Sequence, residues 1–232
     1  VGALIGFIFR KLSHKFSDIV LSFAAGVMLA AAVLGLILPA LEQGGTYGTV
    51  VVVAGILTGA LGLQLLRRFL PGMQKLAGVS AAGDTQTERV LLFTAAIALH
   101  NLPEGMAVGV VVAGWLTGNE TISAAAALAL SLGIALQNLP EGAIISMPLK
   151  SNGMKSGRAF AYGALSGAVE PLGAILTILL AAFVTPILPY MLSFAAGAML
   201  YVVVEELIPE MSEGEHSNIG TVFFAVGFSL MM

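Results

Sequence analysis

The sequence predicts an all-α integral membrane protein, in which eight transmembrane helices form one bundle with an inverted repeat. Its 232 residues are 58% hydrophobic and only 10% charged, with a mean hydropathy of +0.97. Soluble domains carry about 25% charged residues, so a chain this poor in charge could not cover its surface in water. Two further observations support this fold class. All Lys and Arg residues gather at three connections, and one polar motif occurs twice inside apolar runs.

Apolar runs divide the chain into segments that can each cross a bilayer, which takes about 20 residues. We expect spans over residues 1–9, 17–41, 49–66, 90–116, 121–149, 159–184, 190–211 and from 219 onward. The first run and the last are short, so we expect the terminal spans to be partly truncated. The whole chain, residues 1–232, is then a single transmembrane domain with one long polar loop at about 71–89.

The basic residues predict how the bundle lies in the membrane. They follow the first, third and fifth spans, and the opposite turns contain none. The ten residues are Arg10, Lys11, Lys15, Arg67, Arg68, Lys75, Arg89, Lys150, Lys155 and Arg158. Because cytoplasmic loops carry an excess of Lys and Arg, we expect this face to be cytoplasmic and both termini to lie outside.

An internal repeat relates the second span to the seventh. SFAAGVML at residues 22–29 matches SFAAGAML at residues 193–200, and a proline follows each, Pro39 and Pro209. These two spans enter the membrane from opposite faces, which makes the repeat inverted. With the two motif-bearing helices between them, the spans read as three, two and three. Many transporters are built from inverted repeats, with the substrate site at the repeat interface.

The polar motif reads LHNLPEG at residues 99–105 and LQNLPEG at residues 136–142. In each copy the acid follows the asparagine by three residues and another polar residue by four, so the three side chains share one helix face. They are His100, Asn101 and Glu104 in the first copy, and Gln137, Asn138 and Glu141 in the second. The proline of each copy removes a backbone hydrogen bond and kinks its helix. We expect the two helices to form two halves of one polar site.

Carboxylates inside the expected spans need a partner, because an unpaired charge costs roughly 2.5–3.5 kcal/mol at a helix centre. These acids are Glu104, Glu141, Glu170, Glu205 and Glu206. The spans contain no Lys or Arg, so the acids are either protonated, as in a simply kinked helix, or bound to a cation. The chain has no cysteine, and carboxylate, amide and imidazole ligands suit Zn²⁺, Fe²⁺, Mn²⁺ or Cd²⁺ better than Ca²⁺ or Mg²⁺. We therefore expect a divalent metal site within the membrane.

The two motifs, Glu170-Pro171 and the sequence EELIPE at residues 205–210 resemble the ZIP family of divalent metal transporters, in particular its bacterial GufA-like branch. The resemblance covers essentially the whole chain. It implies an eight-helix inner-membrane protein, commonly a homodimer, that moves Zn²⁺ and related ions such as Fe²⁺, Mn²⁺ and Cd²⁺ into the cytoplasm. The metal is then the bound substrate, and neither an enzyme activity, an organic cofactor nor a nucleic-acid partner is implied.

The resemblance also implies a central site that is often binuclear. One ion would be bound by Met28, His100, Glu104, Gln137 and Glu141. The other would be bound by Asn101, Glu104, Asn138, Glu141 and Glu170, so that Glu104 and Glu141 bridge the two ions. Some relatives carry an acid where Asn138 stands. The neutral amide in this chain bears on the affinity of the site for the second ion. On the cytoplasmic side, Glu205, Glu206, Glu210 and His216 are either exit ligands or solvated residues.

Two other functions compete with a carrier. An intramembrane metalloprotease would use H-E-x-x-H, with two histidine ligands and a glutamate base. This chain reads H-N-x-x-E and has no second histidine within a span, which disfavours an enzyme. A channel-like metal pathway could use the same residues as a selectivity filter. Only the saturation of flux and its response to a metal gradient would distinguish a channel from a carrier.

Overall fold

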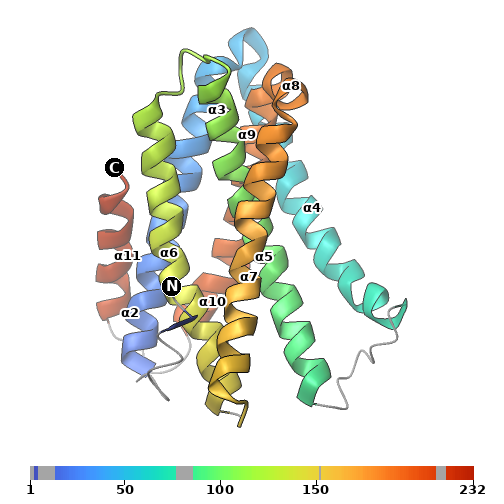
Figure 1. Cartoon of the computed structure of the whole chain (residues 1–232). Coiled ribbons are helices and arrows are strands. Elements are labelled where there is room, and N and C mark those ends of the chain that lie inside the picture. Colours follow the sequence, from blue (N-terminus) through green and yellow to red (C-terminus); the bar gives the residue numbers. More distant parts are fainter. Residues whose placement is uncertain (1–2, 5–13, 77–85, 152, 213–217) are drawn as a thin grey trace.

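The computed structural model describes residues 3–4, 14–76, 86–151, 153–212 and 218–232. These are mostly helical and contain no strand. The helices run side by side as one bundle (Figure 1). They are α2 (His14–Ala30), η1 (Ala31–Ile37), α3 (Leu38–Gln43), η2 (Gly45–Tyr47), α4 (Gly48–Leu76), α5 (Gln86–Leu116), α6 (Ala124–Ser151), α7 (Ser156–Leu179), α8 (Ala181–Val184), η3 (Thr185–Ile187), α9 (Leu188–Val202), η4 (Val203–Leu207), α10 (Ile208–Met211) and α11 (Asn218–Leu230). The expected all-α fold is confirmed.

Several helical segments are long and apolar enough to cross a membrane. Within the described part of the chain these are Asp18–Gln43, Gly45–Leu65, Ser156–Leu179 and Leu188–Glu205. Shorter apolar helices cover Asn101–Leu116, Ala124–Leu136 and Asn218–Leu230. Large apolar side chains such as Leu57 and Leu61 on α4 remain exposed, as expected for a surface that faces lipid. These features support the membrane class; most of the expected first span, residues 1–9, lies outside the described residues.

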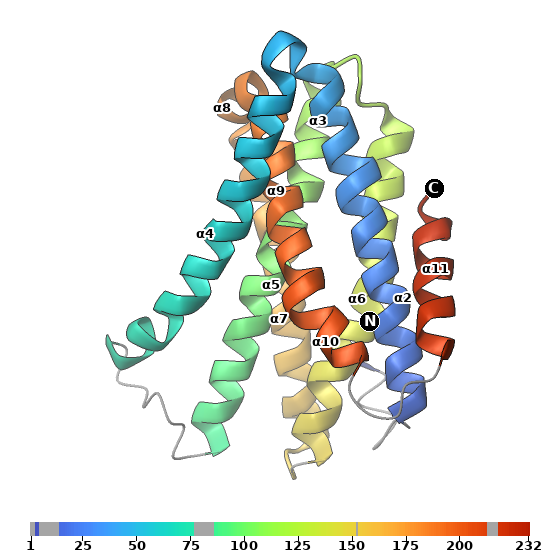
Figure 2. The same ribbon diagram turned by 180° about the vertical axis from the view of Figure 1, so that it is seen from behind.

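The polar connection between the third and fourth spans differs from the expectation of a loop over about 71–89. Helix α4 continues to Leu76, and α5 already begins at Gln86. Hydropathy reports only the part of a helix that faces lipid, whereas a helix can continue into water when its residues become polar, as Gln74 and Lys75 do here. Helix α4 leans away from the bundle towards this end (Figure 2).

Two long helices contain a π-helical segment at corresponding places. The segment η1 follows α2, and η4 follows α9. At the end of each, the residue just before a proline donates its N–H five residues back: Leu38 to Val33 O, and Ile208 to Val203 O. A proline cannot donate and its ring crowds the carbonyl four residues back, so the wider π turn accommodates Pro39 and Pro209.

Glycines bring the helices of the bundle into backbone contact in pairs. A Cβ at Gly26 on α2 would collide with Phe224 O on α11, and one at Gly227 on α11 would collide with Phe23 O. The same relation joins α4 and α9 through Gly59, Gly197 and the carbonyls of Phe194 and Ile56. Figures 1 and 2 show α11 against α2, with α4 on the opposite side of the bundle. Small residues allow such close packing in lipid, where the hydrophobic effect does not drive helices together.

The α4–α9 contact leads to a prediction of stability. Gly197→Ala should lower the melting temperature of the purified protein in detergent, because the new methyl group meets the backbone of Ile56, which cannot move aside. Overpacking of this kind costs about 1–3 kcal/mol. The matched control is Gly62→Ala at the same pair of helices, where a Cβ would lie 3.7 Å from the Phe194 ring. Equal melting temperatures for the two variants would contradict this account of the packing.

Candidate metal centre

The helix that carries the first polar motif, α5, packs directly against α7. A Cβ on Gly105 would collide with the backbone of Glu170, and one on Gly109 would lie within 3 Å of the Ala174 backbone. This contact holds the last turn of the motif beside the only acid of α7. The polar residues of the two helices therefore meet inside the bundle rather than at its surface.

Glu170 joins the two motif helices through hydrogen bonds to its carboxylate. Asn101 Nδ2 donates to Glu170 Oε1 at 2.9 Å, and Asn138 Nδ2 donates to Glu170 Oε2. Asn101 Nδ2 also donates to the carbonyl of Ser166, at 3.3 Å. One carboxylate from α7 thus accepts from an asparagine of α5 and from the equivalent asparagine of α6. The two motifs meet at a shared polar cluster, as their repetition predicts.

Burial makes any polar atom of this cluster that lacks a hydrogen-bond partner energetically costly. Asn101 and Glu104 are 2% and 1% exposed, and Asn138 and Glu170 are partly buried. The side-chain oxygens Asn101 Oδ1 and Asn138 Oδ1 are buried and have no hydrogen-bond partner among the described residues. A buried polar atom without a partner costs about 1–3 kcal/mol. Both oxygens are acceptors, so a cation or an additional donor would satisfy them.

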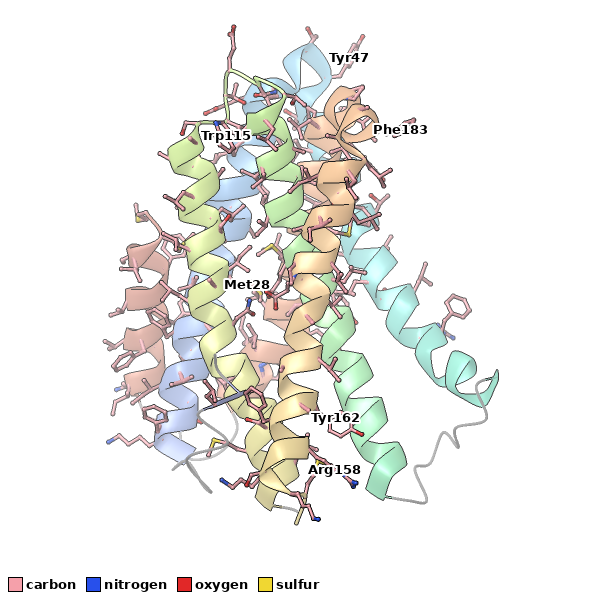
Figure 3. The ribbon with its side chains drawn as sticks, viewed as in Figure 1. Met28, Tyr47, Trp115, Arg158, Tyr162 and Phe183 are labelled. Carbon is pink, nitrogen blue, oxygen red and sulfur yellow. The ribbon has the colours of Figure 1, made fainter. Side chains whose placement is uncertain are left out.

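Other expected ligands are placed only in part. The backbones of His100, Gln137 and Glu141 lie in α5 and α6, on the same turns as the cluster, but their side chains are outside what the structure describes. In the described part of the chain, no three His, Cys, Asp or Glu side chains come together. Met28 is fully buried in the main apolar core, midway along the bundle (Figure 3). Its role as a metal ligand remains a prediction.

The residues expected on the exit side lie in the C-terminal part of the sequence. Glu205 is exposed and belongs to the π-helical segment η4. Glu206 follows it, and Glu210 lies in α10, while His216 is outside the described residues. The exit role of these residues stays a prediction.

Two residues that contribute to the polar cluster were not predicted from side-chain patterns. Ser166 contributes a main-chain carbonyl, which no residue type signals. Gly105 belongs to the motif, but its close approach to Glu170 depends on how α5 and α7 cross. The glycine at the end of each NLPEG copy was the one available hint, because a residue without a Cβ permits a close approach of two backbones.

Apolar helices that enclose acids and amides are typical of integral membrane proteins that bind or transport polar solutes within the bilayer. The chain belongs to the ZIP Zinc transporter family, which it matches over residues 73–232. The resemblance stated from the motifs is confirmed.

Named relatives extend this match to the whole chain. The zinc transporter GufA of Myxococcus xanthus is 34% identical over all of this chain and 91% of its own length. The zinc transporter ZIPB of Bordetella bronchiseptica is 38% identical over all of this chain and 75% of its own length. The zinc transporter ZIP11 of Homo sapiens is 44% identical over 152 residues, which are 65% of this chain and 44% of that protein.

Proposed function

We propose that this protein carries divalent transition metal ions, Zn²⁺ foremost, across the inner membrane into the cytoplasm. The observation that supports this most is the hydrogen-bonded cluster of Asn101, Asn138 and Glu170, in which two buried amide oxygens lack a partner among the described residues. Glu104, which is also buried, lies one turn from Asn101 on α5. A cation is the ligand that satisfies acids and acceptor oxygens together. The relatives are zinc transporters and their family consists of transporters, so an intramembrane metalloenzyme is set aside.

The metal in this proposal lies between α5 and α6, centred on Glu104 and Glu141. His100 and Gln137 share helix faces with these acids, and the family resemblance adds the thioether of Met28. A second ion, sharing both glutamates, would lie towards Asn101 and Asn138. Because amide and thioether groups are weak ligands for these ions, the site can release what it binds, as transport requires. The path of the metal from this site to the cytoplasm then passes four residues, Glu205, Glu206, Glu210 and His216.

We further propose eight spans in a three–two–three inverted repeat, with both termini outside the cell. The paired π-helical segments and the paired glycine contacts support this repeat. Tyr47, Trp115 and Phe183 lie towards one end of the bundle, and Arg158 with Tyr162 towards the other (Figure 3). Aromatic residues prefer membrane interfaces and basic residues the cytoplasmic side, so the Arg158 end is inside. The family resemblance suggests a homodimer.

Uptake into proteoliposomes tests the function. We expect Zn²⁺ to accumulate inside vesicles that contain the protein, with competition by Cd²⁺, Mn²⁺ and Fe²⁺ and none by Ca²⁺ or Mg²⁺ at equal concentration, since the ligand set favours the former group. Saturation of the initial rate with Zn²⁺ concentration supports a carrier, whereas a linear rate would favour a channel-like pathway. Vesicles that accumulate no more Zn²⁺ than protein-free vesicles would contradict the proposal.

His100 should tune which metal is preferred. His100→Ala removes the one imidazole expected at the site and leaves mainly oxygen ligands, which favour Mn²⁺ relative to Zn²⁺. We therefore expect the ratio of Zn²⁺ to Mn²⁺ uptake to fall in this variant, measured in the same vesicles with both ions present. His14→Ala, which changes a histidine near the start of α2, serves as the control and should leave the ratio unchanged. An unchanged ratio in His100→Ala would remove His100 from the site.

A further inference from the structure

We infer that the hydrogen bond between Gln43 and Asn119 is a latch, which holds the extracytoplasmic end of the bundle closed and breaks in each transport cycle. Asn119 Nδ2 donates to Gln43 Oε1 at 2.7 Å. Gln43 is the last residue of α3, and Asn119 lies in the turn that joins the two motif helices, α5 and α6. The inference rests on the proposed function, since a carrier must open this end to admit the metal.

The turn that carries Asn119 holds its amide in one orientation. Gly118 has a φ of +78°, and the main-chain N–H of Asn119 donates to Gly114 O at 3.0 Å, which caps the end of α5. Asn119 Oδ1 accepts from Thr121 N at 3.0 Å and from Thr121 Oγ1 at 2.8 Å. The amide oxygen is therefore occupied within the turn, and the NH₂ group is presented to Gln43.

An apolar core separates this end of the bundle from the proposed metal centre. Along α5, Asn101 lies about 20 Å from Gly114, at 1.5 Å per residue. A Cβ at Gly114 would lie 2.7 Å from Ile122 Cδ1 and 3.1 Å from Leu188 Cδ2, so α5, α6 and α9 are packed together here. Buried apolar residues of this region include Leu36, Ala40, Val110, Ala127, Leu130 and Leu188. A metal ion cannot cross such a core without losing its hydration, so this conformation is closed on that side.

The latch joins two parts of the chain that separate when this end opens. Figures 1 and 2 show α3 and the turn between α5 and α6 at the same end of the bundle, and Figure 3 shows Arg158 at the other end. Gln43 Nε2 is buried and has no hydrogen-bond partner among the described residues. Opening lets water satisfy this group, which offsets part of the loss of the bond to Asn119. Such a contact favours the closed state only modestly, roughly 2–10-fold, so it can break in every cycle.

A reversible bridge between the two positions tests the inference. The chain contains no cysteine, so Gln43→Cys with Asn119→Cys introduces the only two thiols of the protein. A short bis-methanethiosulfonate reagent joins these thiols through two disulfides. A phosphine reductant breaks the disulfides, and the reductant is removed before uptake is measured. In proteoliposomes, we expect the bridge to abolish Zn²⁺ uptake and reduction to restore it.

A second pair of positions provides the matched control. Thr58 Oγ1 and Tyr190 OH share a hydrogen bond of 2.9 Å between α4 and α9. These helices meet backbone to backbone at Gly59 and Gly197, so we expect them to move as one unit. The same bridge in Thr58→Cys with Tyr190→Cys should therefore leave uptake unchanged, as should the reagent applied to each single variant of the latch.

Removing the latch without a bridge gives an independent measurement. Ala40, one turn from Gln43 on α3, is fully buried, and Ala40→Cys places a thiol there. We expect a polar thiol reagent to label this position roughly 2–10-fold faster when Gln43→Ala is added, because the closed state is then less favoured. Labelling does not depend on transport, so it separates the latch from the proposed function.

Each outcome decides one of the two claims. Uptake by the bridged protein at the unbridged rate, a loss that reduction does not reverse, or an equal loss in the control pair would overturn the latch. An original chain that takes up no Zn²⁺ would contradict the proposed function, and the labelling of Ala40→Cys would then decide the latch. The same labelling decides alone if the double variant does not fold by its melting curve: faster labelling with Gln43→Ala supports the latch, and an unchanged rate overturns it.

Discussion

Replacing Glu104 or Glu141 by alanine is expected to abolish Zn²⁺ uptake while the protein still folds and inserts. Glu104 is 1% exposed within a bundle whose expected spans contain no Lys or Arg, so its charge has a cation as the natural partner. Loss of a group that merely orients a ligand costs about 10–100-fold in affinity, and loss of the ligand itself should cost at least about 100-fold. Initial rates of uptake into proteoliposomes, normalised to inserted protein, measure the effect.

Exposed acids provide the controls for this prediction. Glu42 lies near the end of α3, Glu120 lies in the turn between α5 and α6, and both are exposed. Glu42→Ala and Glu120→Ala should therefore transport at close to the original rate. A general effect of lost negative charge would lower all of these variants alike. Normal transport by both Glu104→Ala and Glu141→Ala would show that the metal does not pass between the two motif helices.

Gly105→Ala is expected to damage both stability and Zn²⁺ binding, although it adds only one methyl group. The new Cβ would collide with the carbonyl and Cα of Glu170, which belong to the backbone of α7. The two helices must separate, and the 2.9 Å hydrogen bond from Asn101 to Glu170 would lengthen with them. We expect a destabilisation of about 1–3 kcal/mol from the overpacking, together with weakened Zn²⁺ binding.

A glycine on the partner helix supplies the comparison. Gly157, near the start of α7, has open space where a Cβ would lie, so Gly157→Ala should leave both the melting temperature and Zn²⁺ affinity intact. Melting curves in detergent and dialysis against Zn²⁺ measure both quantities for each variant. The packing account fails if Gly105→Ala melts and binds like Gly157→Ala.

The sequence predicted the fold class because bilayer spans depend on composition and length, which are local properties. Helix ends that lie beyond the lipid were harder to predict, because a change to polar residues marks the membrane surface and not the end of a helix. The extension of α4 to Leu76 illustrates this. The repeat of residues 22–29 at 193–200 predicted matching helices. Their π-helical segments depend on how each proline is accommodated, and the repeat alone does not specify that.

The site was predictable to the extent that it follows helix periodicity. Spacing alone placed Asn101 and Glu104 on one face, and the repeated motif brought in Asn138. The contribution of Glu170 came from the family resemblance, because no spacing within one helix relates α7 to α5. Which atom of each asparagine faces Glu170, and the role of the Ser166 carbonyl, depend on the crossing of three helices, and only the structure shows them.

The most direct test of the central claim is a crystal structure of the Zn²⁺-loaded protein, with anomalous diffraction recorded at the zinc absorption edge. The account predicts an anomalous peak between α5 and α6, with a Glu104 oxygen at about 2.0–2.2 Å from the ion. The same map shows whether the Asn101 and Asn138 oxygens turn towards that peak. A peak found only at the surface of the bundle, with Glu104 unliganded, would contradict the account.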